Sequence, residues 1–300
     1  MTAENTPRLC FIGFGEAGQA LASGLQEAGV KTLAAWDILF SEAAGERLRE
    51  AAAKLGVRQA ASAADAVAGA DIVIAAVTAA SSLEAAAAAK PHLTANQFYL
   101  DINSVSPGRK QETGKLLHDV ARYVDVAVMA PVHPARHRTP VLLAGEYAEA
   151  VEPVLRGLDM KASIAGSEIG AAAAIKMVRS VMIKGVEALC VECFLAASRA
   201  GVEDQIVASL SHTYPGIDWP KVVAYNLERM ANHGDRRAHE MEQVADTLRE
   251  LGIEPLMTTG TIARQYQMGK LGKVDAVQAT LTLGHSDILR AISKASPGRN

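Results

Sequence analysis

The stretch RLCFIGFGEAGQALASGLQEAGVKTLAAWD, residues 8–37, decides the fold. It opens with an apolar run, passes through GFGEAG, continues with small and apolar residues at a helical spacing, and closes with a second apolar run that ends at Asp37. The order strand, glycine loop, helix and strand predicts a βαβ unit with two parallel strands.

Three glycines of the loop, Gly13, Gly15 and Gly18, follow the spacing G-x-G-x-x-G. Between a strand and a helix, the first glycine allows a tight turn, the second the close approach of a pyrophosphate, and the third the packing of helix against strand. The helix N-terminus offers N–H groups and the positive end of its dipole to phosphates. We therefore predict a dinucleotide site formed by Gly13, Phe14, Gly15, Glu16, Ala17 and Gly18.

Asp37 ends the second strand, where an acidic side chain accepts hydrogen bonds from both ribose hydroxyls and repels a 2′-phosphate. Residues 38–40 that follow it are Ile, Leu and Phe rather than an arginine. The sequence therefore favours NAD as the cofactor. NADP stays an alternative, because Arg47 and Arg49 lie one helix further on.

The composition limits the classes of partner. The chain has 300 residues, 49% of them hydrophobic, which is enough for a large core in one or two domains. Lys and Arg total 30 against 33 Asp and Glu, so the formal net charge is −3 and no global positive field attracts nucleic acid or an anionic membrane. We therefore expect a small-molecule partner, and neither nucleic acid nor a membrane.

The N-terminal residues and the cysteines indicate a compartment. MTAENTPR lacks the basic and apolar regions of a signal peptide, and no segment reaches 18 uninterrupted apolar residues, so we expect a cytoplasmic protein without a membrane span. Its three cysteines, Cys10, Cys190 and Cys193, fit a reducing compartment. The last two form a C-x-x-C within a helical pattern and have no second ligand pair, so we interpret them as packing groups and expect no metal site.

The first half of the sequence alternates short apolar runs with helical stretches. Continuous apolar runs are typical of strands covered on both faces, and their alternation with helices predicts a parallel, doubly wound sheet of the Rossmann type. The predicted strands are residues 9–14, 32–37, 71–77, 97–102, 123–128, 141–146 and 161–166.

After residue 166 only helical patterns follow. The predicted helices are residues 170–201, 203–211, 219–232, 235–251 and 257–271. We place the boundary near 166–168, which gives a dinucleotide-binding domain (1–166) and an all-α domain for substrate binding and dimerisation (167–300). The first of these helices, about 48 Å long at 1.5 Å per residue, needs cover for its apolar side chains, so we expect a homodimer.

Lys176 is the candidate acid or base. It lies on the long helix directly after the boundary, where the second domain must face the carboxyl ends of the strands. In a cleft that excludes water, burial lowers the pKa of a lysine and suits it to exchange a proton with a substrate hydroxyl. The alternative is that Lys176, Ser180, Lys184 and Glu187 form the polar stripe of an amphipathic helix, with the last two paired.

The chain resembles the β-hydroxyacid dehydrogenases, the superfamily of 3-hydroxyisobutyrate dehydrogenase and 6-phosphogluconate dehydrogenase, over nearly its whole length. The resemblance rests on GFGEAG, on DINSVSP (101–107), on DVAVMAP (125–131) and on GAAAAIKMVRS (170–180). In that family the helix lysine acts as acid or base, which implies the same role for Lys176. The stretch 233–255 resembles a subgroup with a poorly characterised C-terminal domain.

Three departures from the family concern the substrate side. The family's asparagine four residues after the lysine is Ser180 here, and its Ser-Gly-Gly segment, which grips a substrate carboxylate, is Met-Ala-Pro at 129–131. Proline lacks an N–H group and methionine lacks a hydroxyl, so this grip is weakened. The family's later Lys-Asp pair falls at His239 and Glu240. The nucleotide side matches.

Two basic clusters are candidates to replace the lost carboxylate grip. HPARHR (133–138) follows the altered segment, and HGDRRAH (233–239) lies in the helical half. Arginines that converge on the cleft would hold a carboxylate bidentately. The alternative is that both clusters are solvated surface or form salt bridges between subunits.

Polar residues at the ends of two further strands complete the predicted site. Asn103 and Ser104 close the strand beside the nicotinamide and are expected to contact the carboxamide or the substrate, or else to cap the helix near Pro107. Val77 ends another predicted strand and Thr78 follows it, and both are expected beneath a ribose. The predicted substrate-binding residues are Asn103, Ser104, Met129, His133, Ser180 and His239.

The sequence thus predicts an NAD(P)-dependent oxidoreductase that moves a hydride between nicotinamide and a hydroxy acid or related alcohol. Two alternatives remain at this stage. Imine reductases resemble the same architecture but generally lack the helix lysine, and a non-catalytic dinucleotide sensor would use the helical half to bind a protein.

Overall fold

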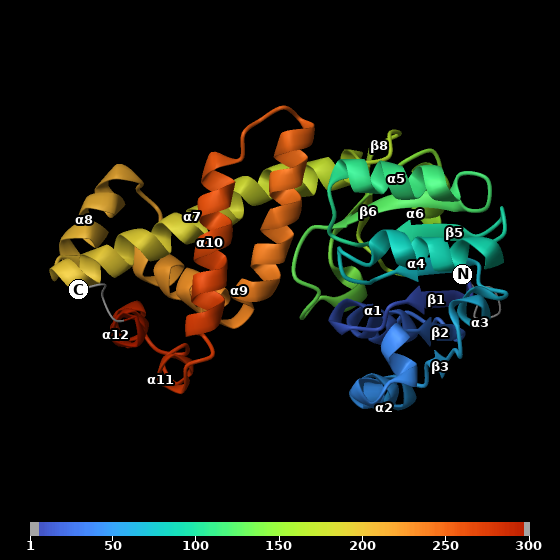
Figure 1. Cartoon of the computed structure of the whole chain (residues 1–300), viewed down its shortest axis with the longest axis horizontal. Helices are drawn as coiled ribbons and strands as arrows, with labels where there is room; N and C mark the ends of the chain where they lie inside the picture. Colours follow the sequence, from blue (N-terminus) through green and yellow to red (C-terminus); the bar gives the residue numbers. More distant parts are fainter. Residues whose placement is uncertain (1–5, 297–300) are drawn as a thin grey trace. The chain divides into compact units, whose positions relative to one another are not determined.

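The computed structural model describes residues 6–296, which form two compact units, one up to Met177 and one from Val178 onward (Figure 1). The sequence divides the domains where the strands end, at residue 166, whereas the compact units divide inside helix α7 (Ala171–Ala200). The first two turns of α7 therefore belong with the sheet.

The first unit contains one sheet of eight strands in the order β3-β2-β1-β4-β5-β6-β7-β8. Its strands are β1 (Leu9–Ile12), β2 (Leu33–Trp36), β3 (Arg58–Gln59), β4 (Ile72–Ala75), β5 (Phe98–Asp101), β6 (Arg122–Val128), β7 (Val141–Ala144) and β8 (Ala162–Gly166). All neighbouring strands are parallel except the antiparallel pair β6 and β7. The predicted Rossmann-type sheet is confirmed; the short edge strand β3 and the reversal at β7 were not predicted.

Helices of the first unit cover both faces of this sheet (Figure 1). They are α1 (Glu16–Glu27), α2 (Glu46–Lys54), α3 (Ala63–Val67), α4 (Ser82–Ala89), α5 (Pro107–Leu117) and α6 (Ala148–Gly157), with short 3-10 turns at Ile38–Ser41, Ala43–Gly45, Lys90–His92 and Arg136–Arg138. Leu9 and Phe11 pack with α1, α2 and α6, whereas Cys10 and Ile12 pack with α3, α4 and α5. Because successive side chains of a strand point to opposite faces, a continuous apolar run contributes side chains to the hydrophobic core on each face of the sheet.

The second unit is helical throughout its described residues. Beyond α7 it contains α8 (Glu203–Thr213), α9 (Trp219–Glu250), α10 (Leu256–Leu271), α11 (Asp275–Gln278) and α12 (His285–Ala295). Its core joins side chains of α7, α9, α10, α11 and α12, including Phe194, Leu227 and Met230. The prediction of helices alone after residue 166 is confirmed, and the two last helices lie outside the predicted set.

One expectation about this unit was wrong. The sequence predicted separate helices at 219–232 and 235–251, whereas α9 is continuous through Gly234. A Cβ at Gly234 would lie 2.3 Å from the carbonyl oxygen of Gln265 on α10. This glycine therefore permits the close crossing of two helices and does not end one.

None of the described helices is both long and apolar enough to cross a bilayer. Among residues 6–296, no group of three or more His, Cys, Asp or Glu side chains is arranged to hold a metal ion. Of the cysteines interpreted as packing groups, Cys10 and Cys190 are buried, whereas Cys193 is exposed.

Candidate functional site

The strand order defines a switch point in the sheet. Strand β1 lies between β2 and β4, so the chain proceeds from β1 toward one edge through β2 and β3, and toward the other through β4 and β5. In open α/β sheets, ligands bind beyond the carboxyl ends of the strands at this point. The loops that follow β1, β4 and β5 all lie there.

The loop after β1 owes its shape to two glycines. Gly13 has a φ of +90°, and a Cβ there would lie 2.5 Å from the carbonyl oxygen of Ala76. A Cβ at Gly18 would lie 2.9 Å from the carbonyl oxygen of Gly13, so its absence lets α1 pack against the loop. Both predicted roles, a tight turn and close packing of the helix, match this geometry.

Gly15 differs from the other two glycines. A Cβ on this residue would meet no atom within 4 Å, so the front of the loop is open. Gly15 is also the N-cap of α1 and, as a glycine, brings no side chain of its own to this helix end. The arrangement fits a dinucleotide, because a pyrophosphate can approach the backbone there and receive hydrogen bonds from N–H groups at the helix end.

Asp37 fastens the glycine loop to the end of β2. Its Oδ2 accepts a hydrogen bond from the backbone N–H of Phe14 at 2.8 Å, and its Oδ1 accepts one from Leu39 at 3.0 Å. Each carboxylate oxygen keeps a further lone pair, so the half-buried carboxylate can still accept ribose hydroxyls. The sequence predicted a ribose role for Asp37 and did not predict this structural one.

The loops after β4 and β5 are joined by Asn103. Its Oδ1 accepts from the backbone N–H of Val77 at 2.8 Å, and its Nδ2 donates to Oδ1 of Asp101 at 2.7 Å. Thr78, the next residue, is exposed, and its hydroxyl donates to Ser81 at 3.0 Å. The alternative that Asn103 or Ser104 caps α5 is wrong, since the cap is Ser106, whose hydroxyl accepts from the backbone N–H of Arg109.

Lys176 and Ser104 meet at this edge of the sheet. The Nζ of Lys176 donates a hydrogen bond to the Oγ of Ser104 at 2.5 Å. Lys176 lies on the part of α7 that belongs to the first unit, and both residues are partly exposed. An amine thus lies beside the loop after β5, at the end of the sheet where the nicotinamide of a bound dinucleotide is expected.

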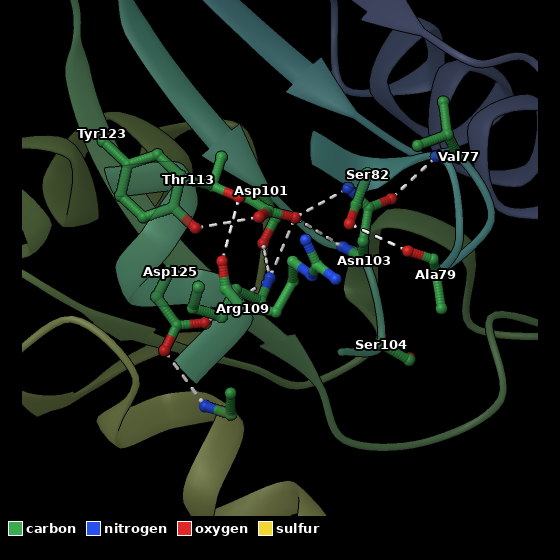
Figure 2. A network of polar contacts seen from close by, with 12 residues as sticks. Val77, Ala79, Ser82, Asp101, Asn103, Ser104, Arg109, Thr113, Tyr123 and Asp125 are labelled. Atoms are coloured by element: carbon green, nitrogen blue, oxygen red, sulfur yellow. Dashed lines mark hydrogen bonds and ion pairs between the residues drawn. The ribbon is translucent and has the colours of Figure 1, made fainter. Parts of the chain in front are cut away.

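A buried polar network lies behind these loops. Figure 2 shows Asp101 between Tyr123 and Asn103, with Asp125 directed toward the start of α7. Lys110 on α5 forms ion pairs with both carboxylates, at 3.0 Å to Asp101 and 3.6 Å to Asp125. Burial raises the pKa of Asp125, an effect that the charge of Lys110 opposes. No sequence signal marked Lys110, because a lysine early in a helix usually faces solvent.

Met129 and His133 lie in the segment after β6 and differ in their surroundings. Met129 packs against a small cluster of Ala127, Ala144 and Ala172, so it contacts the first turn of α7. His133 is exposed.

The first basic cluster packs against α1 and forms ion pairs with acidic residues at the end of α1 and after α6. Arg136 binds both carboxylate oxygens of Glu27 at 2.5 Å, and Nε of Arg138 lies 2.6 Å from Asp159. His137 is only 1% exposed, and neither of its ring nitrogens has a hydrogen-bond partner among the described residues. Both arginines therefore form salt bridges, as the alternative expected. Their carboxylate partners lie in the same unit of the same chain and not in a second subunit.

Ser180 and His239 belong to the second unit. Ser180 is buried on α7, whereas His239 is exposed on α9, with its ring edge-to-face to Tyr266 at 5.5 Å between centroids. The structure therefore brings together Lys176, Asn103 and Ser104 in the first unit and leaves His133 and His239 on surfaces.

The polar stripe of α7 makes different pairs from those expected. Lys184 binds Glu240 at 2.8 Å, and Glu187 pairs with Arg237, so the predicted pair between Lys184 and Glu187 is wrong. All four residues lie on α7 and α9. Burial lowers the pKa of Lys184, whereas Glu240 opposes the shift. These buried pairs were not predicted, because partners from distant helices leave no local spacing signal.

Comparisons with known proteins fit this geometry. The family described as "NADP oxidoreductase coenzyme F420-dependent" matches residues 8–104, and the "Domain of unknown function (DUF1932)" matches residues 197–268. A conserved hypothetical protein from Sinorhizobium meliloti 1021 is 35% identical, with 98% of each chain covered and a TM-score of 0.80.

Two further solved structures are similar. Conserved protein MTH1747, of unknown function and described as structurally similar to 3-hydroxyacid dehydrogenases, is 33% identical over 88% of this chain and 97% of its own, with a TM-score of 0.71. The 3-hydroxyisobutyrate dehydrogenase of Mycobacterium tuberculosis is 18% identical over 96% of this chain and 99% of its own, also with a TM-score of 0.71. At that identity the likeness shows the fold alone.

Proposed function

We propose that the chain, which belongs to the β-hydroxyacid dehydrogenase-like superfamily and carries a C-terminal DUF1932 domain, acts on a hydroxy acid or a related alcohol. It would transfer a hydride between this substrate and a nicotinamide dinucleotide. The observation that carries the proposal is the hydrogen bond from Lys176 to Ser104 at the edge of the sheet, beside the loops of the switch point.

The dinucleotide would lie across the ends of β1 and β4. Its pyrophosphate would face the open side of Gly15 and the start of α1, and its adenosine ribose would meet Asp37. The proposed contact residues are Gly13, Phe14, Gly15, Glu16, Ala17, Gly18, Asp37, Val77 and Thr78. When bound, the nicotinamide supplies a carbon that accepts or returns a hydride.

NAD is the preferred form in this proposal. The Asp37 carboxylate repels a 2′-phosphate, and Arg49 donates to the backbone carbonyls of Phe40 and Glu42 at 2.9 and 2.8 Å, which holds its guanidinium against the loop. Arg49, a cation that could otherwise pair with a 2′-phosphate, is thus bound to these two carbonyls. Titration with NADH and NADPH tests the preference, and tighter binding of NADPH would contradict it.

Lys176 would handle the proton. In oxidation, the substrate hydroxyl loses its proton to the neutral amine while its carbon loses a hydride, so that a carbonyl forms; in reduction, the ammonium returns the proton. Ser104 would orient the amine and hydrogen-bond the reacting oxygen, and Asn103 would hold the loop beneath them. A positioned acid or base of this kind contributes about 10²–10⁴-fold to the rate.

The proposed substrate class rests on the resemblance to 3-hydroxyacid dehydrogenases. We infer a carboxylate-bearing alcohol, for which Asn103, Ser104 and Met129 of the first unit are the proposed further contacts. Arg136 and Arg138 are not included, since both pair with acidic residues of the first unit. We also propose that the enzyme is a homodimer, because side chains such as Met182 and Leu189 on α7 are 67% and 57% exposed. A cytoplasmic location stays a prediction from the sequence.

A screen of hydroxy acids with NAD⁺ and NADP⁺, followed by nicotinamide absorbance, tests this function. Reduction of the cofactor by at least one hydroxy acid is the expected result. Reduction of imines with NADH, without oxidation of any alcohol, would favour imine reductase chemistry. Binding of NADH without turnover of either class would instead favour a dinucleotide sensor.

A further inference from the structure

Asp125 fixes the start of helix α7. Its Oδ2 accepts hydrogen bonds from the backbone N–H groups of Gly170 and Ala173, each at 3.1 Å, and its side chain is 0% exposed. The first N–H groups of a helix have no partner within the helix, so a carboxylate from a strand is an effective anchor for them. Lys176 lies one turn beyond Ala173 on the same helix.

Lys110 balances the charge of this anchor. Its Nζ donates to the backbone carbonyl of Asp101 at 2.5 Å, lies 3.0 Å from Oδ1 of Asp101, and lies 3.6 Å from Oδ1 of Asp125. Oδ1 of Asp125 has no hydrogen-bond partner among the described residues, so its polar contact is the ion pair with Lys110. The side chains of Lys110 and Asp101 are each 1% exposed. Removal of one member of such a buried set leaves the others uncompensated.

The buried charges of Lys110, Asp101 and Asp125 also fix the position of Ser104, the hydrogen-bond partner of Lys176. Oδ1 of Asp101 accepts from the backbone N–H and from Nδ2 of Asn103, at 3.0 and 2.7 Å. Ser104 is the next residue. Asp101 thus fixes the loop that carries Ser104, as Figure 2 shows. Asp125 fixes the start of the helix that carries Lys176.

We propose that Lys110 and Asp125 are positioning residues that hold the amine of Lys176 in its place beside Ser104, at the carboxyl ends of the strands. They touch neither substrate nor cofactor in this account, and they act through the first turn of α7. The inference rests on the proposed function for its catalytic meaning. Its structural content, the placement of one amine, can be measured without a substrate.

The test uses two variants of the full-length protein, Lys110→Met and Asp125→Asn. The first removes the cation and keeps its aliphatic stem; the second keeps the volume of the side chain and one acceptor oxygen. Lys115→Met is the matched control, because Lys115 lies on the same helix and is exposed. Circular dichroism verifies folding, and Asp125→Glu and the double variant Lys110→Met with Asp125→Asn provide conservative and charge-balanced comparisons.

Two readouts are measured on each protein. The first separates kcat from KM for whichever hydroxy acid the wild type oxidises, together with the Kd for NADH. The second is the rate at which acetic anhydride acetylates Lys176, followed by peptide mass spectrometry, which reports the environment of the amine directly. A residue that contributes only to folding would change neither kcat nor this rate in a folded variant.

The expected result is a loss of about 10²-fold in kcat, with KM and the Kd for NADH within about twofold of wild type, since misplacement by about 1 Å costs that much. The acetylation rate of Lys176 changes in both variants and stays at the wild-type value in Lys115→Met. Should Lys110→Met fail to fold, Asp125→Asn decides. A folded Asp125→Asn with wild-type kcat and wild-type acetylation overturns the proposal.

The readouts also separate this proposal from the proposed function. If the wild type oxidises no hydroxy acid but the acetylation of Lys176 changes in both variants, the function fails and the positioning role stands. If turnover is found and the variants change neither readout, the function stands and the positioning role fails.

Discussion

The ammonium of Lys176 donates to the hydroxyl of Ser104 at 2.5 Å, so the lysine of the long helix and the loop after β5 are in direct contact. We expect Ser104→Ala to reduce kcat/KM by about tenfold, because the amine loses one charge-assisted hydrogen bond that orients it. Steady-state kinetics measure the change, and Ser163→Ala, at an exposed position of β8, is the control. A Ser104→Ala enzyme as active as wild type would show that this contact does not orient the amine.

We expect the substitution to alanine to have opposite effects on stability at Gly15 and Gly13, two glycines of the loop after β1. Gly15→Ala should leave the free energy of unfolding unchanged or raise it by up to about 1 kcal/mol, since the new methyl group meets no atom and the backbone is extended. The Kd for NADH should rise by about tenfold or more, because the methyl group occupies the approach of the pyrophosphate. Urea titration and NADH fluorescence measure the two quantities.

Gly13→Ala should instead destabilise the protein by about 2 kcal/mol or more, owing to its positive φ and the nearby carbonyl of Ala76. If Gly15→Ala binds NADH as tightly as wild type, the dinucleotide does not approach the loop there.

A second pair of glycines, Gly234 and Gly260, tests the helix crossing in the second unit. Gly234→Ala should reduce stability although alanine has the higher helix propensity, because its methyl group would meet the backbone of α10. Gly260→Ala on α10, where a Cβ meets no atom within 4 Å, should raise stability by up to about 1 kcal/mol. Urea titration of both variants checks the contrast. Equal effects of the two substitutions would contradict the close crossing.

His137 predicts a pH dependence of stability. Burial lowers the pKa of its imidazole below the ordinary value of 6.5, and the neighbouring cation Arg138 lowers it further. The unfolded chain therefore binds a proton more readily than the folded one, so stability is present above pH 6.5 and is lost as the pH falls through the folded pKa.

Unfolding of wild type and His137→Gln at about pH 7.5 and about pH 5.5 measures this contribution. The wild type should lose more stability than the variant over this interval, while His212→Gln, at an exposed position, should behave as wild type. The paired carboxylates of Glu27 and Asp159 titrate below this range, because their arginine partners lower their pKa values. An equal pH dependence in wild type and His137→Gln would contradict the buried, neutral imidazole.

The nucleotide half of the fold was predictable because its signals are local. The strand, the glycine loop and the helix lie within residues 8–27, and each glycine leaves a constraint that the sequence displays. Gly234 shows the limit of such reasoning, since a glycine inside a helical pattern indicates a break or a close contact, and only the position of α10 distinguishes the two.

The candidate site was predictable only in part, for a related reason. Lys176, Asn103 and Ser104 lie at strand or helix ends, where topology alone brings them to one edge of the sheet. Lys110 has no such signal, because its two partners are on β5 and β6 and the pairing depends on how α5 packs. Buried ion pairs between distant segments are a property of the tertiary structure.

The measurement that tests the account most directly compares the wild type with Lys176→Ala in NAD⁺ reduction by the hydroxy acids of the screen, alongside the Kd of each for NADH. The predicted result is a fall in kcat of about 10²–10⁴-fold with the Kd for NADH nearly unchanged. A Lys176→Ala enzyme that reduces NAD⁺ at the wild-type rate would contradict the central claim that this amine transfers the proton.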